Sequence, residues 1–294
     1  MGGGSWTKDA FSAYSRSVGR SVDTSGVVTT AYNSAQDMFK TRRLADALNP
    51  KNVIRECCDS EEHPNTIPVI LALDVTGSMG SAAMEVAKKL NAIMTKLYDK
   101  VKDVEFLIMG IGDLAYDEAP IQASQFESDI RIAEQLDKVY FEGGGGGNSF
   151  ESYTAAWYFG LHHTNLDCWK RGKKGIIITM GDEPLNPYLP YRELKESTGD
   201  SLQGNVDTAE LYKAVAEKFE VYHLMVDDRA TMLRCYENSV MNSFGKYLDG
   251  QHLMKVTLNS LENAIVDIVS KASENETETV SCVGEVNENG EIAW

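Results

Sequence analysis

The chain has 294 residues, with 44 acidic against 28 basic side chains and a formal net charge of −16. Such an acidic surface repels phosphate backbones, so nucleic acid is excluded as the main partner. Cations or basic protein faces are favoured, and plain solubility explains the charge equally well. No apolar run approaches the ~18 residues of a membrane span, so no membrane segment is expected.

The N-terminal residues MGGGSW show neither the basic nor the apolar region of a signal peptide. The five cysteines are an odd number, and Cys57 and Cys58 are adjacent. This usage is typical of reduced thiols rather than of a disulfide framework. We therefore expect a cytoplasmic protein.

The first 63 residues form an N-terminal extension in this interpretation. Residues 1–35 are rich in Ser, Thr and Gly, which predicts a loosely ordered arm or a surface wrap. Residues 36–47 predict a short helix that ends before Asn49 and Pro50.

Strands and helices are expected to alternate from Pro68 onward. Strands are predicted over residues 69–73, 104–111, 176–180, 221–226 and 252–256, with a short edge strand over 121–126. Helices are predicted over residues 84–97, 130–140, 151–161, 232–244 and 261–272, and from an N-cap at Asp207 through Phe219. Loops are predicted over residues 142–148, which are rich in glycine, and 185–205.

This alternation predicts an α/β fold with a doubly wound, mostly parallel sheet and helices on both faces. We place this domain at residues 64–272. The remaining residues, 273–294, form an acidic tail with six glutamates and no Lys or Arg. We expect that tail to be disordered, or to form a short strand over residues 278–286.

Several aspartates follow the predicted strands. They are Asp74, Asp113, Asp182 and Asp227. Because parallel strands end at one edge of a sheet, where ligands of such folds bind, these carboxylates are expected to share a crevice.

The segment after the first core strand reads DVTGSMG. A tight loop through Gly77 brings oxygens of Asp74, Thr76 and Ser78 toward one point. One carboxylate with two hydroxyls is a hard-oxygen set that suits Mg²⁺ or Mn²⁺. Free hydroxyls are weak ligands, so further carboxylates are needed, and Glu151 and Asp182 are the candidates.

These residues resemble the motifs of von Willebrand factor A (vWA) domains, which have a Rossmann-like fold. The run from Asp74 to Met79 resembles the D-x-[ST]-G-S motif of the metal-ion-dependent adhesion site. The segment GGNSFE resembles the second ligand loop of one branch, in which the glutamate, here Glu151, is the ligand. The segment GDEP resembles the third motif, with Asp182 as the last carboxylate. Phe150 replaces the proline of that second loop, so Asn148 and Ser149 remain alternative ligands, and Asp113 is an additional candidate.

The resemblance implies a binding module rather than an enzyme. The cation of the family keeps one coordination position open, and an acidic residue of a partner protein fills it. The motifs resemble those of the intracellular bacterial and phage type, whose members resemble scaffolds that work with AAA ATPases, kinases or phosphatases, so a partner of that kind is expected. An enzyme is the alternative, since D-x-T-G-S also resembles the nucleophile loop of haloacid dehalogenases. Asp74 would then be the nucleophile of a phosphotransferase or phosphatase.

Other interpretations of the same residues stay open. The DVTGS run could be a helix start capped by Ser78 or Ser81. Asp113 and Asp117 could form an auxiliary cation site. Zinc at His162, His163 and Cys168, or at Cys57, Cys58 and His63, lacks the usual ligand spacing. Tyr153, Trp157 and Tyr158 could line a pocket, although their helical spacing is more typical of core residues.

Overall fold

The structure is a computed structural model, and it describes residues 4–142, 147, 150–227 and 234–278. Its centre is a six-stranded sheet in the order β10-β9-β6-β2-β3-β4. The strands are β2 (Ile67–Asp74), β3 (Val104–Ile111), β4 (Ile121–Glu127), β6 (Gly175–Gly181), β9 (Phe219–Val226) and β10 (Leu253–Val256). All neighbours pair in parallel except β3 and β4, which are antiparallel.

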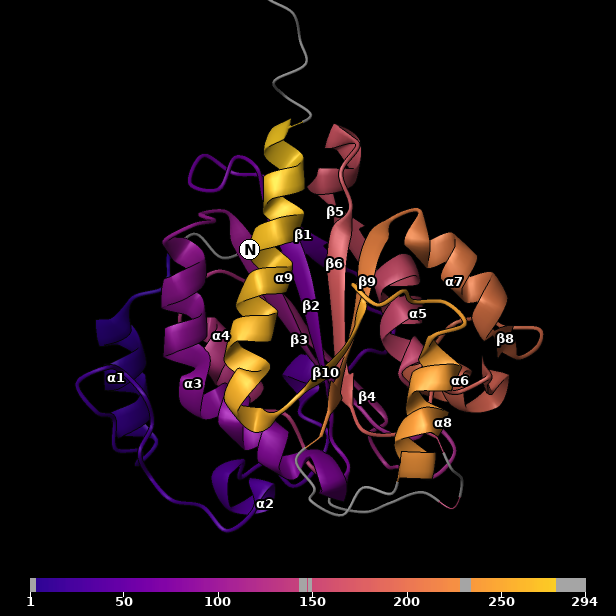
Figure 1. The fold of residues 1–294 in the computed structure, drawn as a ribbon, viewed down its shortest axis with the longest axis horizontal. Coiled ribbons are helices and arrows are strands. Elements are labelled where there is room, and N and C mark those ends of the chain that lie inside the picture. Colours follow the sequence, from indigo (N-terminus) through magenta and orange to yellow (C-terminus); the bar gives the residue numbers. More distant parts are fainter. Residues whose placement is uncertain (1–3, 143–146, 148–149, 228–233, 279–294) are drawn as a thin grey trace, which may run out of the picture.

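Helices cover both faces of this sheet (Figure 1). One face carries α1 (Lys8–Ser17), α3 (Gly80–Tyr98), α4 (Arg131–Leu136) and α9 (Leu258–Glu278). The other carries α5 (Thr154–His162), α6 (Tyr191–Thr198), α7 (Thr208–Ala216) and α8 (Arg234–Phe244). The predicted doubly wound α/β fold is therefore confirmed.

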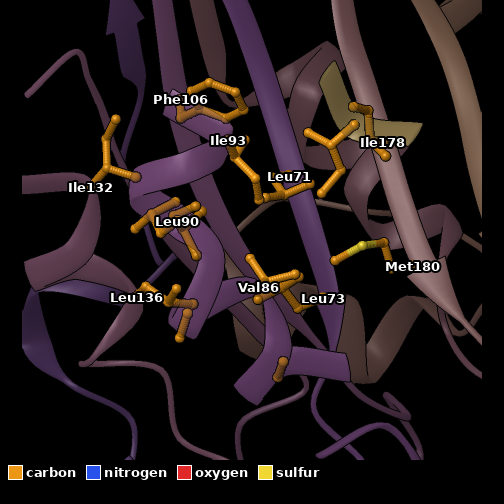
Figure 2. Packing of buried hydrophobic residues seen from close by; sticks show 14 of the residues in the cluster. Leu71, Leu73, Val86, Leu90, Ile93, Phe106, Ile132, Leu136, Ile178 and Met180 are labelled. Atoms are coloured by element: carbon orange, nitrogen blue, oxygen red, sulfur yellow. The ribbon is translucent and has the colours of Figure 1, made fainter. Parts of the chain in front are cut away.

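Alternation along β2 separates two hydrophobic clusters. All eight residues of β2 are buried, as expected for a central strand with helices on both sides. Leu71 and Leu73 point toward Val86 and Leu90 of α3, as Figure 2 shows. Ile70 and Ala72, which alternate with these residues, belong to the opposite cluster, which packs against α5. Burial on both faces fixes the register of β2 and therefore the position at which Asp74 leaves the sheet.

The N-terminal extension wraps around the α3 face, which is one of the two arrangements expected from its composition. Trp6, Phe11 and Val28 are buried in the cluster that α3 and the sheet share. The indole of Trp6 donates a 3.1 Å hydrogen bond to Oδ1 of Asn91 on α3. The first strand of the extension, β1 (Arg55–Cys57), pairs in parallel with β5 (Thr164–Leu166).

The helix predicted over residues 36–47 is wrong for most of its length. The structure has only α2 (Ala35–Met38), an irregular stretch and a 3₁₀ turn, η1 (Asp46–Leu48). Phe39 adopts an extended conformation and stacks on Phe141 with ring centroids 4.6 Å apart. The guanidinium of Arg42 then donates to the main-chain oxygens of Phe39 and Gln36. Tertiary contacts thus override the local helix preference.

Three other predictions need correction. The loop predicted over residues 185–205 contains α6 and a strand, β7 (Tyr188–Leu189), that pairs with β8 (Val206–Asp207). The helix predicted over residues 130–140 ends at Leu136, because the main chain then tightens into turns in which Lys138 and Val139 donate to the oxygens of Gln135 and Leu136. The C-terminal helix runs on to Glu278, and the rest of the predicted strand at 278–286 lies outside the described residues.

The other strand predictions are confirmed to within a few residues. Asp207 caps α7 as predicted, since its side chain accepts from the main-chain N–H groups of Ala209 and Glu210. Within the described part of the chain, no helix is both long enough and apolar enough to span a membrane.

Candidate metal centre

The predicted carboxylates gather where the central strands end. Asp74 is the last residue of β2, Asp182 follows β6, and Asp113 lies two residues beyond β3. All three side chains are at most 2% exposed. Asp227 follows β9 at the same edge, but its carboxylate forms an ion pair with Lys255, whose Nζ lies 2.7 Å from Oδ2, so its charge is already balanced.

Four oxygens lie in a row across this edge, with a hydrogen bond at each end of the row. The hydroxyl of Thr76 donates to Oδ1 of Asp74 at 2.5 Å, and it lies 3.5 Å from Oγ of Ser78. The hydroxyl of Ser78 donates to Oδ1 of Asp182 at 2.9 Å. The structure therefore brings together four of the residues singled out in the sequence, from two adjacent strands. A short 3₁₀ turn, η2 (Gly77–Met79), produces this geometry by tightening the loop before α3.

The interpretation of this loop as a simple capped helix start is wrong. Helix α3 begins at Gly80, and Met79 occupies the N-cap position without a side-chain cap. The hydroxyls of Thr76 and Ser78 instead face the two carboxylates.

Tyr153 is a member of the site that the sequence indicated only as a core residue or a possible pocket-lining residue. It is fully buried in the core beside Trp157 and Tyr158, as the spacing of these aromatic residues predicts. Its phenol nevertheless donates a 2.7 Å hydrogen bond to Oδ2 of Asp74. A Cβ atom at position 181 would lie 1.9 Å from the same phenol oxygen, so only glycine fits there.

Glu151 approaches the site from a loop and not from a helix. It forms a parallel bridge with Leu185, and its main-chain N–H donates to the oxygen of Pro184 at 3.3 Å. The side chain is 5% exposed, and its Oε2 atom is buried without a hydrogen-bond partner. Burial raises the pKa of Glu151 far above its usual range, and the charge of Asp74 raises it further.

A second acidic loop borders this site. Oδ1 of Asp113 accepts from the N–H of Ala115 at 2.8 Å, while Oδ2 is buried without a partner. Oδ2 of Asp117 accepts from the N–H of Asp113 at 2.7 Å. Burial raises the pKa of Asp117 to about 6 despite that bond, and the carboxylates of Glu142 and Asp113 add to the shift. Burial and the charge of Asp74 likewise raise the pKa of Glu183 to about 7.

The donor set fits a hard divalent cation. Buried oxygens without partners are costly in a folded protein, and a bound ion is one way to satisfy them. At this site, two such oxygens are Oε2 of Glu151 and Oδ2 of Asp113. Asp74 and the two hydroxyls add the carboxylate and neutral oxygens that Mg²⁺ accepts alongside water. Asn148 and Ser149, the alternative ligands, lie outside the described residues.

The carboxylates are not drawn together into a cage. Among the residues that the structure describes, no three His, Cys, Asp or Glu side chains are grouped closely enough to surround one ion. This spacing is consistent with a site in which hydroxyls and water supply part of the coordination. The lack of such a group among the described residues also counts against both zinc interpretations. Nε2 of His163, for example, lies 2.7 Å from Oδ2 of Asp200, and Nδ1 lies 2.9 Å from the main-chain oxygen of Val53.

No protein-family model matches the chain. No curated protein matches it either. Among solved structures it is similar to the pilus adhesin SpaC from Lactobacillus rhamnosus GG, with 14% identity and a TM-score of 0.45 over 76% of this chain. The chain spans only 31% of that adhesin.

Two shorter solved structures are similar over 71% of this chain. The vWF domain of the type V pili tip protein Mfa5 from Porphyromonas gingivalis is 12% identical, with a TM-score of 0.43 over 96% of its own length. The conserved hypothetical protein BatB from Bacteroides thetaiotaomicron is 16% identical, with a TM-score of 0.42 over 99%. At these levels of similarity, the function has to be argued from the site itself.

Proposed function

We propose that this chain is a vWA-like interaction module that binds a divalent cation, Mg²⁺ or Mn²⁺, and through it an acidic residue of a partner protein. The observation that carries the proposal is the row of oxygens from Asp74 through Thr76 and Ser78 to Asp182. It joins the ends of two adjacent parallel strands, where ligands of such sheets bind. The buried, unpartnered oxygen of Glu151 supplies a further acceptor beside it.

In this proposal, Asp74, Thr76 and Ser78 hold the ion directly, and Glu151 and Asp182 hold it directly or through water. When bound, the ion supplies an open coordination position for a carboxylate. Ser78 is the ligand that would face the partner protein, because it is exposed whereas Asp74 and Asp182 are buried. The surrounding acidic residues repel an incoming carboxylate, so its affinity has to come from short-range coordination and not from net charge.

The phosphotransferase alternative finds no support in the arrangement of the chain. Helix α3 begins at Gly80, six residues after Asp74, which leaves no room for the insert of that superfamily. Lys173 and Lys174 precede β6, and therefore lie at the opposite end of that strand from Asp182. Neither lysine is placed to bind a phosphate beside Asp74.

The proposal is tested first by calorimetry of Mg²⁺ binding to the full chain. We expect binding by the wild type and none by Asp74→Ala. Asp227→Ala is the matched control, because Asp227 also follows a parallel strand but is paired with Lys255. It should bind Mg²⁺ as the wild type does. Equal binding by Asp74→Ala would assign the ion elsewhere.

The partner is sought by affinity capture from the source cell in Mg²⁺ and in EDTA. We expect a set of proteins that is retained by the wild type in Mg²⁺ and lost both in EDTA and with Asp74→Ala. Undiminished capture in EDTA would mean that the partner binds outside this site. The expected association with an AAA ATPase, kinase or phosphatase system, and the cytoplasmic location, stay predictions that the identity of the captured proteins would test.

A further inference from the structure

A groove of about 230 Å³ opens directly beside the proposed metal loop. One side is formed by Thr76, Ser78 and the first turn of α3. The other side is formed by residues 33–36 of the N-terminal extension, with Phe141. The extension therefore supplies one wall of a recess whose other wall carries two of the proposed metal ligands. Figure 1 shows α2 next to the start of α3.

The extension wall is fixed in place by several contacts. Gln36 donates a 3.3 Å hydrogen bond to the main-chain oxygen of Phe141. The ring of Phe39 stacks on Phe141, and Oγ of Ser34 accepts from the N–H of Asp37 at 3.2 Å. A Cβ atom at Gly80 would lie 3.1 Å from the Cβ of Ala35, so the two walls already meet at the base of the groove. A wall held in this way is pre-organised for binding.

The groove differs chemically from the carboxylate side of the site. Its lining combines hydroxyl and amide side chains with two glycines and with Ala35, Met84 and Phe141, and it contains no charged side chain. A charged group entering it would lose water without gaining an ionic partner. Its volume is below the ~300 Å³ at which small-molecule pockets begin, and so suits a single side chain. The thioether of Met84 and the ring of Phe141 favour an aromatic group.

We propose that this groove receives an uncharged aromatic side chain, tyrosine in the best case, that lies next to the metal-bound acidic residue in the partner protein. The inference rests on the proposed function, because the metal loop anchors the acidic residue. The hydroxyl of a tyrosine finds partners among the polar groups of the rim. Asn33 is one of these, since it is exposed and its side chain makes no hydrogen bond within the described part of the chain.

The test uses an array of immobilised nonapeptides with a central Glu and all twenty residues at each flanking position. Labelled full-length protein is applied in Mg²⁺. We expect Tyr and Phe to be preferred at one flanking position, and Lys, Asp and Glu to be disfavoured there. Asn33→Trp fills the groove from its exposed rim and should bind the best peptide about tenfold more weakly, with the flanking preference lost. Asn165→Trp, at an exposed position on β5, is the matched control and should behave as the wild type.

The outcomes separate this inference from the function on which it rests. A flanking preference that survives in Asn33→Trp would overturn the groove assignment, as would Mg²⁺-dependent binding with no flanking preference. Peptide binding that persists in EDTA or with Asp74→Ala would instead contradict the metal-dependent function. Calorimetry of Asn33→Trp with Mg²⁺ alone should match the wild type, because the substitution lies outside the proposed ligand set.

Discussion

The phenol of Tyr153 donates a 2.7 Å hydrogen bond to Oδ2 of Asp74, the central carboxylate of the candidate metal centre. Groups that hydrogen-bond a metal ligand orient it, and their removal typically costs 10–100-fold in metal affinity. We therefore expect Tyr153→Phe to weaken Mg²⁺ binding by roughly that factor, measured by calorimetry. We also expect a loss of about 2 kcal/mol in the free energy of unfolding, because the bond is made to a buried acidic group.

Tyr158→Phe provides the control for this prediction. Tyr158 lies on α5, the helix that Tyr153 precedes, and its phenol donates to Oδ2 of Asp200 at 2.6 Å, away from Asp74. Its removal should lower stability without changing the affinity for Mg²⁺. If both variants bind the ion equally well, then Tyr153 has no role in positioning Asp74.

The site illustrates which contacts a sequence can reveal. Asp74, Thr76 and Ser78 are close in the chain, and the rule that parallel strands end at one edge adds Asp182. Tyr153 could not be found in this way, because its hydrogen bond spans 79 residues and its spacing is that of a core residue. Glu151 was found as a ligand candidate but placed on a helix, whereas its main chain bonds to Pro184.

The extension shows the same limit at the level of the fold. Its composition indicates little order, since Ser, Thr and Gly give weak periodicity. Order comes from a few long-range contacts, such as Trp6 with Asn91 and Arg20 with Asp137. Such pairs join residues 85 and 117 positions apart, and no local pattern marks them. Sequence periodicity could therefore predict the sheet, whereas composition left a loosely ordered arm and a surface wrap as alternatives for the extension.

Removal of divalent ions should lower the stability of the wild type. Burial and the charge of Asp74 both disfavour the ionised form of Glu151, and a bound divalent ion would stabilise that form. An ion that binds only the folded state adds about 2.7 kcal/mol at a 100-fold excess over Kd. We expect a higher Tm in Mg²⁺ than in EDTA. Asp74→Ala should show no such difference, and an equal Tm of the wild type in both buffers would argue against the site.

The ion pair between Arg20 and Asp137 should contribute strongly to the attachment of the extension. The two side chains are 6% and 15% exposed and form two hydrogen bonds. Removing one partner of a buried pair leaves an uncompensated charge, which typically costs about 3 kcal/mol or more. We expect Arg20→Met to lower the free energy of unfolding by about that amount in urea titrations.

Arg16→Met is the matched substitution, because Arg16 lies on α1 with its side chain exposed. It should change stability by no more than about 0.5 kcal/mol. Similar losses in both variants would mean that the pair with Asp137 is not the cause.

The last prediction concerns His223, which lies beneath the site and packs against Tyr153. Burial lowers the pKa of His223 to about 3, and Nδ1 lies 2.9 Å from the hydroxyl of Thr179. Between about pH 3 and 6.5 the unfolded chain therefore binds a proton at this residue that the folded chain does not bind, so stability falls as the pH falls through this window.

From pH 7 to pH 5, the wild type should lose about 2 kcal/mol of its free energy of unfolding through His223. His223→Asn should be less stable than the wild type at pH 7, because it loses the ring packing against Tyr153 and Phe244. Because asparagine does not titrate, this difference in stability should narrow by about 2 kcal/mol at pH 5. Asp117 and Glu183 titrate in the same range in both proteins, and their effect cancels in the difference. Urea unfolding of both proteins at the two pH values measures this difference. If the difference in stability between the two proteins is the same at both pH values, then His223 accepts a proton in the folded state about as readily as in the unfolded state.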